Sequence, residues 1–233
     1  MRNSPVLAAL IFVAAAASPA AAADRNYSVT SFDRIRLDGP FKVHLVTNVA
    51  PFAKASGSPE ALDGISIEVQ GHTLIVHSNR SSWGGYPGRQ LGPVEIRVGT
   101  HDLAAAFLNG PGSLSIDKVR GLSFELAIQG AGAANIAKVE VDQLKVGISG
   151  AASATLGGRA PKMTAIIRGV SVFDASALAA KDVVVGAEGP AIIKVNAISS
   201  AKIDAMGTAT IEVTGNPACT VKASGSVTVT GCR

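Results

Sequence analysis

Four histidines are the side chains of this sequence with the greatest potential for acid–base or metal chemistry. They are His44, His72, His77 and His101. His72 and His77 flank one expected strand and, five residues apart, point to opposite faces, whereas a metal site needs ligands that converge. We therefore expect exposed histidines on strands and turns, and we assign no metal ligand.

Carboxylates are the second group that could do chemistry, and they are dispersed. Those of the repeating half fall at outward positions, at Asp174, Glu188, Asp204 and Glu212. Asp174 and Glu212 would share one column of a repeating structure, with Lys194 between them. A polysaccharide lyase or glycosidase needs its acid and base clustered on one face. A ladder of alternating charge is the favoured interpretation, so no catalytic residue is assigned.

Cofactor and nucleic-acid motifs have little support. The sequence contains no G-x-S-x-G, no phosphate-binding loop and no calcium-binding glycine nonapeptide. Residues 130–133 resemble a glycine-rich nucleotide loop only superficially, because no helix is expected after them. Basic residues are scattered singly, without interleaved aromatic residues. We expect no cofactor and no nucleic-acid partner.

The second half of the chain, which carries the carboxylates named above, repeats with a period of about 20 residues. One glycine recurs at intervals of 18 to 20 residues, at Gly110, Gly130, Gly150, Gly169, Gly189, Gly207 and Gly225. Every second residue around each glycine is apolar or small, and Ser171 is the only polar exception. Such a repeat indicates stacked coils that close a continuous core. We predict an all-β parallel β-helix of about seven coils, with the glycine at a structural corner of each coil.

Each coil is expected to have two alternating strands and a third segment that links it to the next, such as residues 137–143. A slip of one residue would turn every apolar side chain outward, so the register is strongly determined. Some outward positions next to the corners are also apolar. They form a weakly apolar strip, at Ala131, Ala133, Ala151, Val170, Val172 and Ile192. We expect this strip to pack against another subunit, a ligand surface or the N-terminal segment.

Residues 24–102 are predicted to form an N-terminal β segment before the repeats of residues 103–233. Residues 35–45 alternate in the phase of the coils, so they form either an additional coil or a capping strand. Residues 65–69 and 73–77 indicate an antiparallel hairpin, and residues 94–98 one more strand. We expect a tail at residues 24–31 and loops at residues 47–64 and 81–93, where Pro and Gly interrupt the pattern. An antiparallel sandwich remains the alternative for this third of the chain.

Residues 1–23 have the features of a secretory signal peptide: a basic start, a short apolar run and an A-x-A cleavage site. The apolar run is too short to span a bilayer comfortably, and no later stretch approaches 18 apolar residues, so no membrane span is predicted. We expect an exported bacterial protein, in the periplasm, at the cell surface or outside the cell. In an oxidising compartment Cys219 and Cys232 are expected to form a disulfide, with two free thiols as the alternative.

The segment from Phe32-Asp33-Arg34-Ile35 to Gly39-Pro40-Phe41-Lys42-Val43 resembles the opening of the putative auto-transporter adhesin head domain, or GIN domain. Corners such as Ser149-Gly150-Ala151-Ala152 and Ser224-Gly225-Ser226-Val227 resemble the repeated Ser-Gly-Ser-Gly corners of that family. The resemblance implies a secreted or cell-envelope β-helical protein with no catalytic residues to transfer.

The function predicted from these observations is a non-enzymatic, adhesin-head-like module for binding or scaffolding. Its partner would be an envelope or extracellular ligand, either protein or polysaccharide, and assembly into a homo-oligomer stays open. The alternative is a polysaccharide lyase or hydrolase. That enzyme would need a pocket built from residues 83–93 together with His77 and His101.

Overall fold

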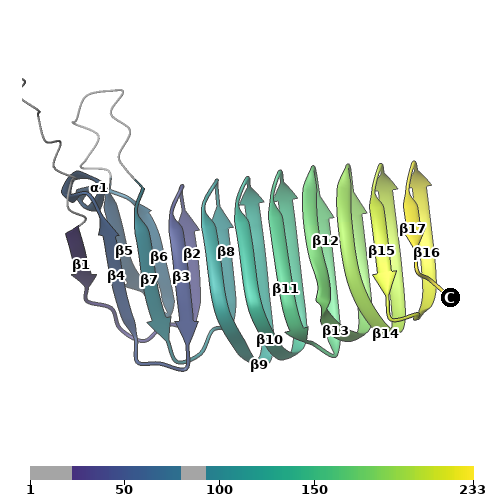
Figure 1. Ribbon diagram of the computed structural model, residues 1–233, viewed down its shortest axis with the longest axis horizontal. Coiled ribbons are helices and arrows are strands. Elements are labelled where there is room, and N and C mark those ends of the chain that lie inside the picture. The colour runs from purple at the N-terminus through teal and green to yellow at the C-terminus, as the bar shows by residue number, and fades with distance from the viewer. Residues whose placement is uncertain (1–22, 80–92) are drawn as a thin grey trace, which may run out of the picture.

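The computed structural model describes residues 23–79 and 93–233. Over these residues the chain forms an elongated β-solenoid of about six turns (Figure 1). The predicted parallel β-helix is confirmed, and the predicted count of about seven coils differs only slightly from this number. The predicted signal peptide and the predicted loop at residues 81–93, with Trp83 and Tyr86, lie almost entirely outside the described residues.

Most turns consist of one long strand that bends twice. The long strands are β9 (Ser113–Gly130), β10 (Ala133–Gly150), β13 (Ser171–Glu188) and β14 (Ala191–Gly207). One turn is divided into β11 (Ser153–Arg159) and β12 (Lys162–Arg168), because Pro161 between them has no N–H to donate to the ladder. Neighbouring turns pair in parallel and in register, so residues about 20 positions apart lie side by side.

Each turn has three faces, which we name by their order after the glycine corner. In β10 the first face is residues 133–136, the connecting face is residues 137–142 and the return face is residues 143–149. The chain bends where two successive residues both point outward, at Ala137 and Lys138 and again at Asp142 and Gln143. The predicted linking segment is itself a paired face, because Val139 lies opposite Val119 of the preceding turn.

The recurring glycines form one corner column of the solenoid. All seven have a positive φ, between 95° and 121°. At Gly150 an added Cβ would lie 2.3 Å from the carbonyl oxygen of Gly130, so the corners also need close backbone approach. Ser171, the polar exception, is buried, and its hydroxyl donates a hydrogen bond of 3.0 Å to the carbonyl oxygen of Gly150. A buried hydroxyl is tolerated there because it has a partner.

The N-terminal strands continue the stack, but in an order that differs from the sequence. They are β2 (Arg34–Asp38), β3 (Lys42–Thr47), β6 (Thr73–Ser78), β7 (Glu95–Thr100) and β8 (Ala105–Asn109). Strand β2 lies in parallel between β6 and β8, and β3 lies in parallel between β7 and β9. Residues 34–47 therefore form an additional coil of the stack, which was one of the two alternatives predicted for residues 35–45; the other was a capping strand. The coil of β6 and β7, although later in the sequence, lies outside it.

Antiparallel strands and a short helix close this end. Strand β5 (Ile65–Gln70) pairs with β6, which confirms the predicted hairpin. Strand β4 (Phe52–Gly57) pairs with β7, and β1 (Ala23–Tyr27) pairs with β4. Helix α1 (Pro59–Asp63) follows β4. The antiparallel-sandwich alternative is wrong, because β2, β3, β6 and β7 stack in parallel.

Two predictions for irregular structure in this region are wrong. Residues 47–64 contain β4 and α1, and residues 24–31 contain most of β1. The inward side chains of β4 are only Ala53 and Ala55, which give a weak apolar signal. Pro59 begins a helix because it stands in the first turn, where Ser58 Oγ accepts a hydrogen bond from the N–H of Ala61.

The C-terminal end of the solenoid carries β15 (Thr210–Thr214), β16 (Ala218–Gly225) and β17 (Thr228–Thr230). The structure contains the predicted disulfide between Cys219 and Cys232, with a Cα–Cα distance of 5.5 Å. It joins β16 to the residues after β17. No described helix has the length and apolar character needed to cross a membrane.

Candidate ligand-binding groove

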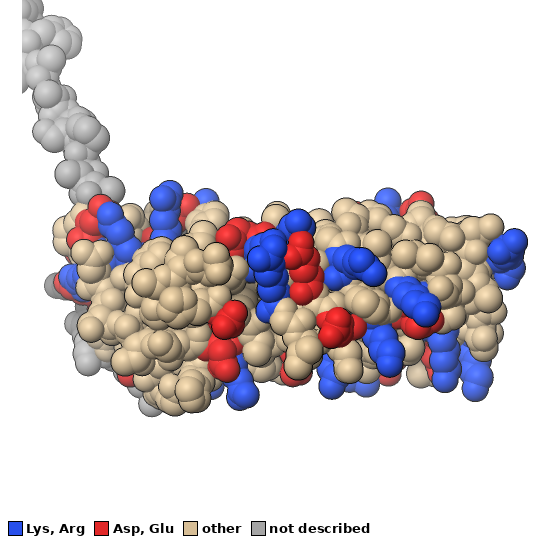
Figure 2. Space-filling view, turned by 90° about the horizontal axis from the view of Figure 1, so that it is seen from below, with Lys and Arg blue, Asp and Glu red and all other residues tan. Residues whose placement is uncertain are grey.

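The connecting face gathers charged residues that are far apart in the sequence. Arg120, Glu140 and Arg159 occupy one column, in the order of three successive turns. Lys118 and Lys138 occupy a neighbouring column two residues earlier. Figure 2 views this face and shows acidic and basic side chains grouped over the middle turns. The solenoid period, through the in-register stacking of turns, creates this cluster.

Glu140 is the centre of the cluster. Its Oε2 lies 2.7 Å from Arg120 Nε and 3.1 Å from Lys118 Nζ, and its Oε1 lies 2.8 Å from Lys138 Nζ. Hydrogen bonds from Lys138, then Arg120 and Lys118, lower the pKa of Glu140 from 4.5 to about 2. The carboxylate is therefore ionised throughout the physiological pH range, and both of its oxygens are engaged by cations.

The first prediction concerns this pKa. In a carboxyl-detected NMR titration, we expect Glu140 to titrate with a midpoint near pH 2. Because the pKa is lower in the folded state, the stabilisation from Glu140 is fully present above pH 4.5 and is lost as the pH falls toward 2. Lys138→Ala should raise the midpoint, whereas Lys145→Ala on the return face should not. A wild-type midpoint near 4.5 would contradict the cation cluster.

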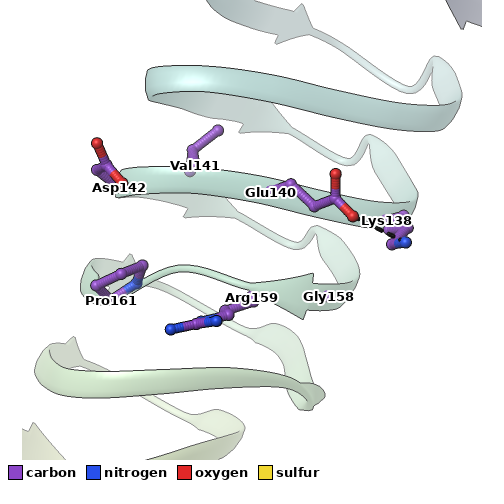
Figure 3. Close-up of a pocket in the computed structure, with 7 residues that line it drawn as sticks. All are labelled: Lys138, Glu140, Val141, Asp142, Gly158, Arg159 and Pro161. Carbon is purple, nitrogen blue, oxygen red and sulfur yellow. Dashed lines mark ion pairs between the residues drawn. The ribbon is translucent and has the colours of Figure 1, made fainter.

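Beside Glu140 lies an open groove of about 640 Å³. Figure 3 shows its lining, which comprises Lys138, Glu140, Val141, Asp142, Gly158, Arg159 and Pro161. Arg159 pairs in register with Glu140 through the backbone, but within the described residues its guanidinium has no ion pair or hydrogen bond. Asp142 is likewise without a side-chain partner there. The groove therefore offers one free cation and one free carboxylate.

A second depression, of about 260 Å³, adjoins the cluster on its N-terminal side. Its lining includes Lys118 and Arg120, two of the three cations that are paired with Glu140. Asp117, in the same lining, accepts hydrogen bonds from the backbone N–H groups of Thr47 and Lys118, at 3.0 Å and 2.6 Å. The polar surface thus extends over several turns rather than forming one closed pocket.

The structure does not bring the sequence candidates for catalysis together. His77 lies in a depression with Arg36 and Asp38, and its Nε2 is 3.4 Å from Glu68 Oε1. His101 lines the separate depression beside Lys118. Among residues 23–79 and 93–233, no three His, Cys, Asp or Glu side chains are grouped closely enough to hold a metal ion.

The predicted charge ladder and apolar strip are both present. Asp174, Lys194 and Glu212 are successive members of one column, and Lys194 Nζ lies 3.5 Å from Glu212 Oε2. Val172 and Ile192 lie side by side on the first face and are about half exposed. These features occupy a different face from the groove.

The groove was not predicted from the sequence, because its basic residues are isolated from one another along the chain. A signal exists nonetheless: Arg120 and Glu140 each lie ten residues after a corner glycine, and Arg159 lies nine after. Comparing residues at equal distances from the corners would have placed Arg120 and Glu140 in one column, but it would have missed Arg159, which joins them through a shift in register.

Comparisons with known proteins agree with this architecture. A putative adhesin from Bacteroides fragilis has a similar structure, with a TM-score of 0.79 at 19% identity, over 89% of this chain and 95% of that one. A putative lipid binding protein from Parabacteroides distasonis has a TM-score of 0.69 at 17% identity, over the same shares of the two chains. At these identities the likeness establishes the fold alone.

No curated protein has significant sequence similarity to the chain. The sequence profile described as "Putative auto-transporter adhesin, head GIN domain" matches residues 31–217, which is most of the chain. The corner glycines, the stacked apolar rows and this match lead to one conclusion: the chain belongs to the family of the putative auto-transporter adhesin head GIN domain.

Proposed function

We propose that the protein is an exported, non-enzymatic binding module of the bacterial cell envelope whose connecting face binds an acidic polysaccharide. Export is supported by the features of residues 1–23, by the disulfide and by the family. The observation that carries the ligand class is the free guanidinium of Arg159 beside a carboxylate that is already fully engaged.

Arg159 has the chemistry to bind an anionic group. Glu140, its in-register neighbour, is already paired with two cations of the preceding turn and with Lys138 of its own strand, so it leaves the guanidinium of Arg159 available. Guanidinium groups bind carboxylates and sulfates through two parallel hydrogen bonds. Asp142 can accept hydrogen bonds from hydroxyl groups. An acidic sugar presents both kinds of group on one residue.

The shape of the surface favours an extended polymer. The groove is open, and the ion pairs of Glu140 with Lys118 and Arg120 join its lining to that of the second depression. Its lining includes Pro161, whose ring is partly exposed, so the carbon atoms of a sugar ring can pack against it. A polymer lying across several turns would contact cations on each of them.

The state of Glu140 supports binding rather than catalysis. A general base works best when its pKa lies near the operating pH. The pKa of Glu140 is lowered to about 2, so its carboxylate is a poor proton acceptor and an unavailable proton donor at neutral pH. A lyase or hydrolase would need another acid–base pair.

The second prediction tests this proposal with polygalacturonate as the acidic polymer and dextran as the neutral one. By calorimetry we expect binding to polygalacturonate only, and Arg159→Ala should weaken it roughly 10-fold or more, because a charged hydrogen bond is lost. Lys202→Ala, which removes an exposed cation from the return face, is the matched control and should bind normally.

Three results would count against the proposal. Equal affinity of Arg159→Ala and the wild type would exclude the groove as the binding site. Equal affinity for dextran and polygalacturonate would exclude recognition of charge. Release of unsaturated or reducing sugar ends during the incubation would favour the lyase or hydrolase instead.

A further inference from the structure

The two ends of the solenoid differ in how their apolar interior is covered. At the N-terminal end, β5 and β4 pair with the outermost coil, and helix α1 packs beside them. At the C-terminal end, the part of the chain that the structure describes pairs β16 only with β14 and β17 only with β15. Among the described residues, no strand lies on the far side of β16 or β17, and Figure 1 shows these strands at the end of the stack. An unpaired edge of this kind is a template for another strand.

The apolar interior is also open at this end. Val221 lies in register with Ile203, but Val221 is 41% exposed whereas Ile203 is 1% exposed. Exposure increases in the same way from Ala205, which is buried, to its in-register partner Ala223, which is exposed. Inward side chains of the last coil therefore have a partner turn on one side only. Two unpaired strand edges thus flank an exposed apolar row.

The open end is held in place and carries little charge. The disulfide joins Cys219 to Cys232, and the N–H of Arg233 donates a hydrogen bond of 3.2 Å to the carbonyl oxygen of Pro217. Lys222 is the only charged residue within β16 and β17, whose other outward residues are Ala, Thr and Ser. Edge strands of monomeric proteins are commonly protected by several charges, prolines or bulges. Here that protection is slight.

We propose that this end binds a second copy of the chain, forming a two-fold symmetric dimer through β16 and β17. A two-fold axis perpendicular to the solenoid axis brings two identical ends together with their strands antiparallel. The chain itself shows that a solenoid edge of this protein accepts antiparallel strands, because β4 and β5 close the opposite end in that way. At the N-terminal end Leu62, Ile65 and Ile67 are buried, so no exposed apolar row is present there to receive β16 and β17 of another copy. Head-to-tail polymerisation is therefore disfavoured, and assembly stops at two copies.

The dimer would also affect how the protein presents its lateral faces. Joining two copies end to end buries Val221, Ala223 and their neighbours while leaving the connecting face exposed on each copy. The groove around Glu140 is then duplicated along one longer rod. The dimer does not depend on the ligand proposed for the groove, since β16 and β17 contribute no residue to it.

The third prediction is the oligomeric state of the exported protein with its disulfide intact, measured by sedimentation velocity over a concentration series. We expect a reversible dimer, and Val221→Lys should raise its dissociation constant at least 10-fold. Val184→Lys is the matched control, because Val184 is 42% exposed on the return face, close to the 41% of Val221. Circular dichroism of both variants establishes that each is folded.

Hydrogen exchange supplies a second measurement that needs no variant. Amide protection of residues 218–230 should rise with protein concentration, whereas protection of β4 and β5 should not change. A monomer at all concentrations up to roughly 0.5 mM would overturn the proposal. So would a dimer that Val184→Lys disrupts and Val221→Lys does not, because that result would place the interface on a lateral face.

Discussion

Replacing Gly150 with alanine is expected to lower the midpoint of thermal unfolding by roughly 6–12 °C. Gly150 has a φ of 121°, where a side chain typically costs about 1–3 kcal/mol. The new Cβ would also lie 2.3 Å from the carbonyl oxygen of Gly130, so the two corners must move apart. We estimate about 3 kcal/mol in total, and a chain of this length loses roughly 2–4 °C per kcal/mol.

A control in the same turn separates this effect from a general effect of adding a methyl group. Gly147 lies three residues earlier, on the return face, and no atom lies within 4 Å of the position of an added Cβ. Gly147→Ala should leave the midpoint unchanged or raise it slightly, because alanine restricts the unfolded chain. The corner hypothesis fails if calorimetry finds equal midpoints for the two variants.

The second large effect is expected from Phe173→Ala, which should reduce the free energy of unfolding by about 3–5 kcal/mol. Phe173 is completely buried, and it lies in register between Ala154 and Ile193 of the adjacent turns. Because Ala154 is small, the ring of Phe173 fills space that no neighbour can take over. In guanidinium titrations the midpoint should fall while the slope stays unchanged, since the same surface is exposed on unfolding.

Its neighbour on the same strand provides the control. Val172 points to the opposite side and is 47% exposed. Val172→Ala should change the free energy of unfolding by no more than about 0.5 kcal/mol, as is usual for surface substitutions. Similar losses for Phe173→Ala and Val172→Ala would mean that inward and outward positions have been assigned to the wrong faces.

Local signals account for the parts of the fold that could be predicted. Apolar residues at every second position mark the inward row of each strand, and the recurring glycine marks each corner, as the positive φ of Gly150 and Gly130 shows. Residues 35–45 have the same pattern, so their membership of the stack could also be predicted. In contrast, β4 has only Ala53 and Ala55 facing inward, and β1 has no apolar alternation.

The spatial order of the coils could not be read from the chain. Strands β6 and β7 follow β2 and β3 in the sequence but lie outside them in the stack. Which coil lies outermost depends on which edges remain available for pairing after all the strands have formed. That is a property of the assembled sheet, and no local residue pattern encodes it.

For the candidate groove, too, the sequence shows the residue types but not their arrangement in space. The types of Arg120, Glu140 and Arg159 are evident in the sequence, but each looks like an isolated charge. Their shared column depends on where each turn bends, because two successive outward residues change which side chains face the same way. Only the stacked structure shows that Glu140 is engaged by three cations and that Arg159 is left free.

The sequence by itself determined the solenoid class, the glycine corners and the inward rows, because each depends on residue type at a short, regular spacing. Tertiary structure decided which residues of different turns share a face, which end of the stack is closed and which is open. These outcomes depend on bends and on the pairing of edges far apart in the chain. A repeat therefore specifies its own core locally, whereas its binding surfaces arise only when the turns are stacked.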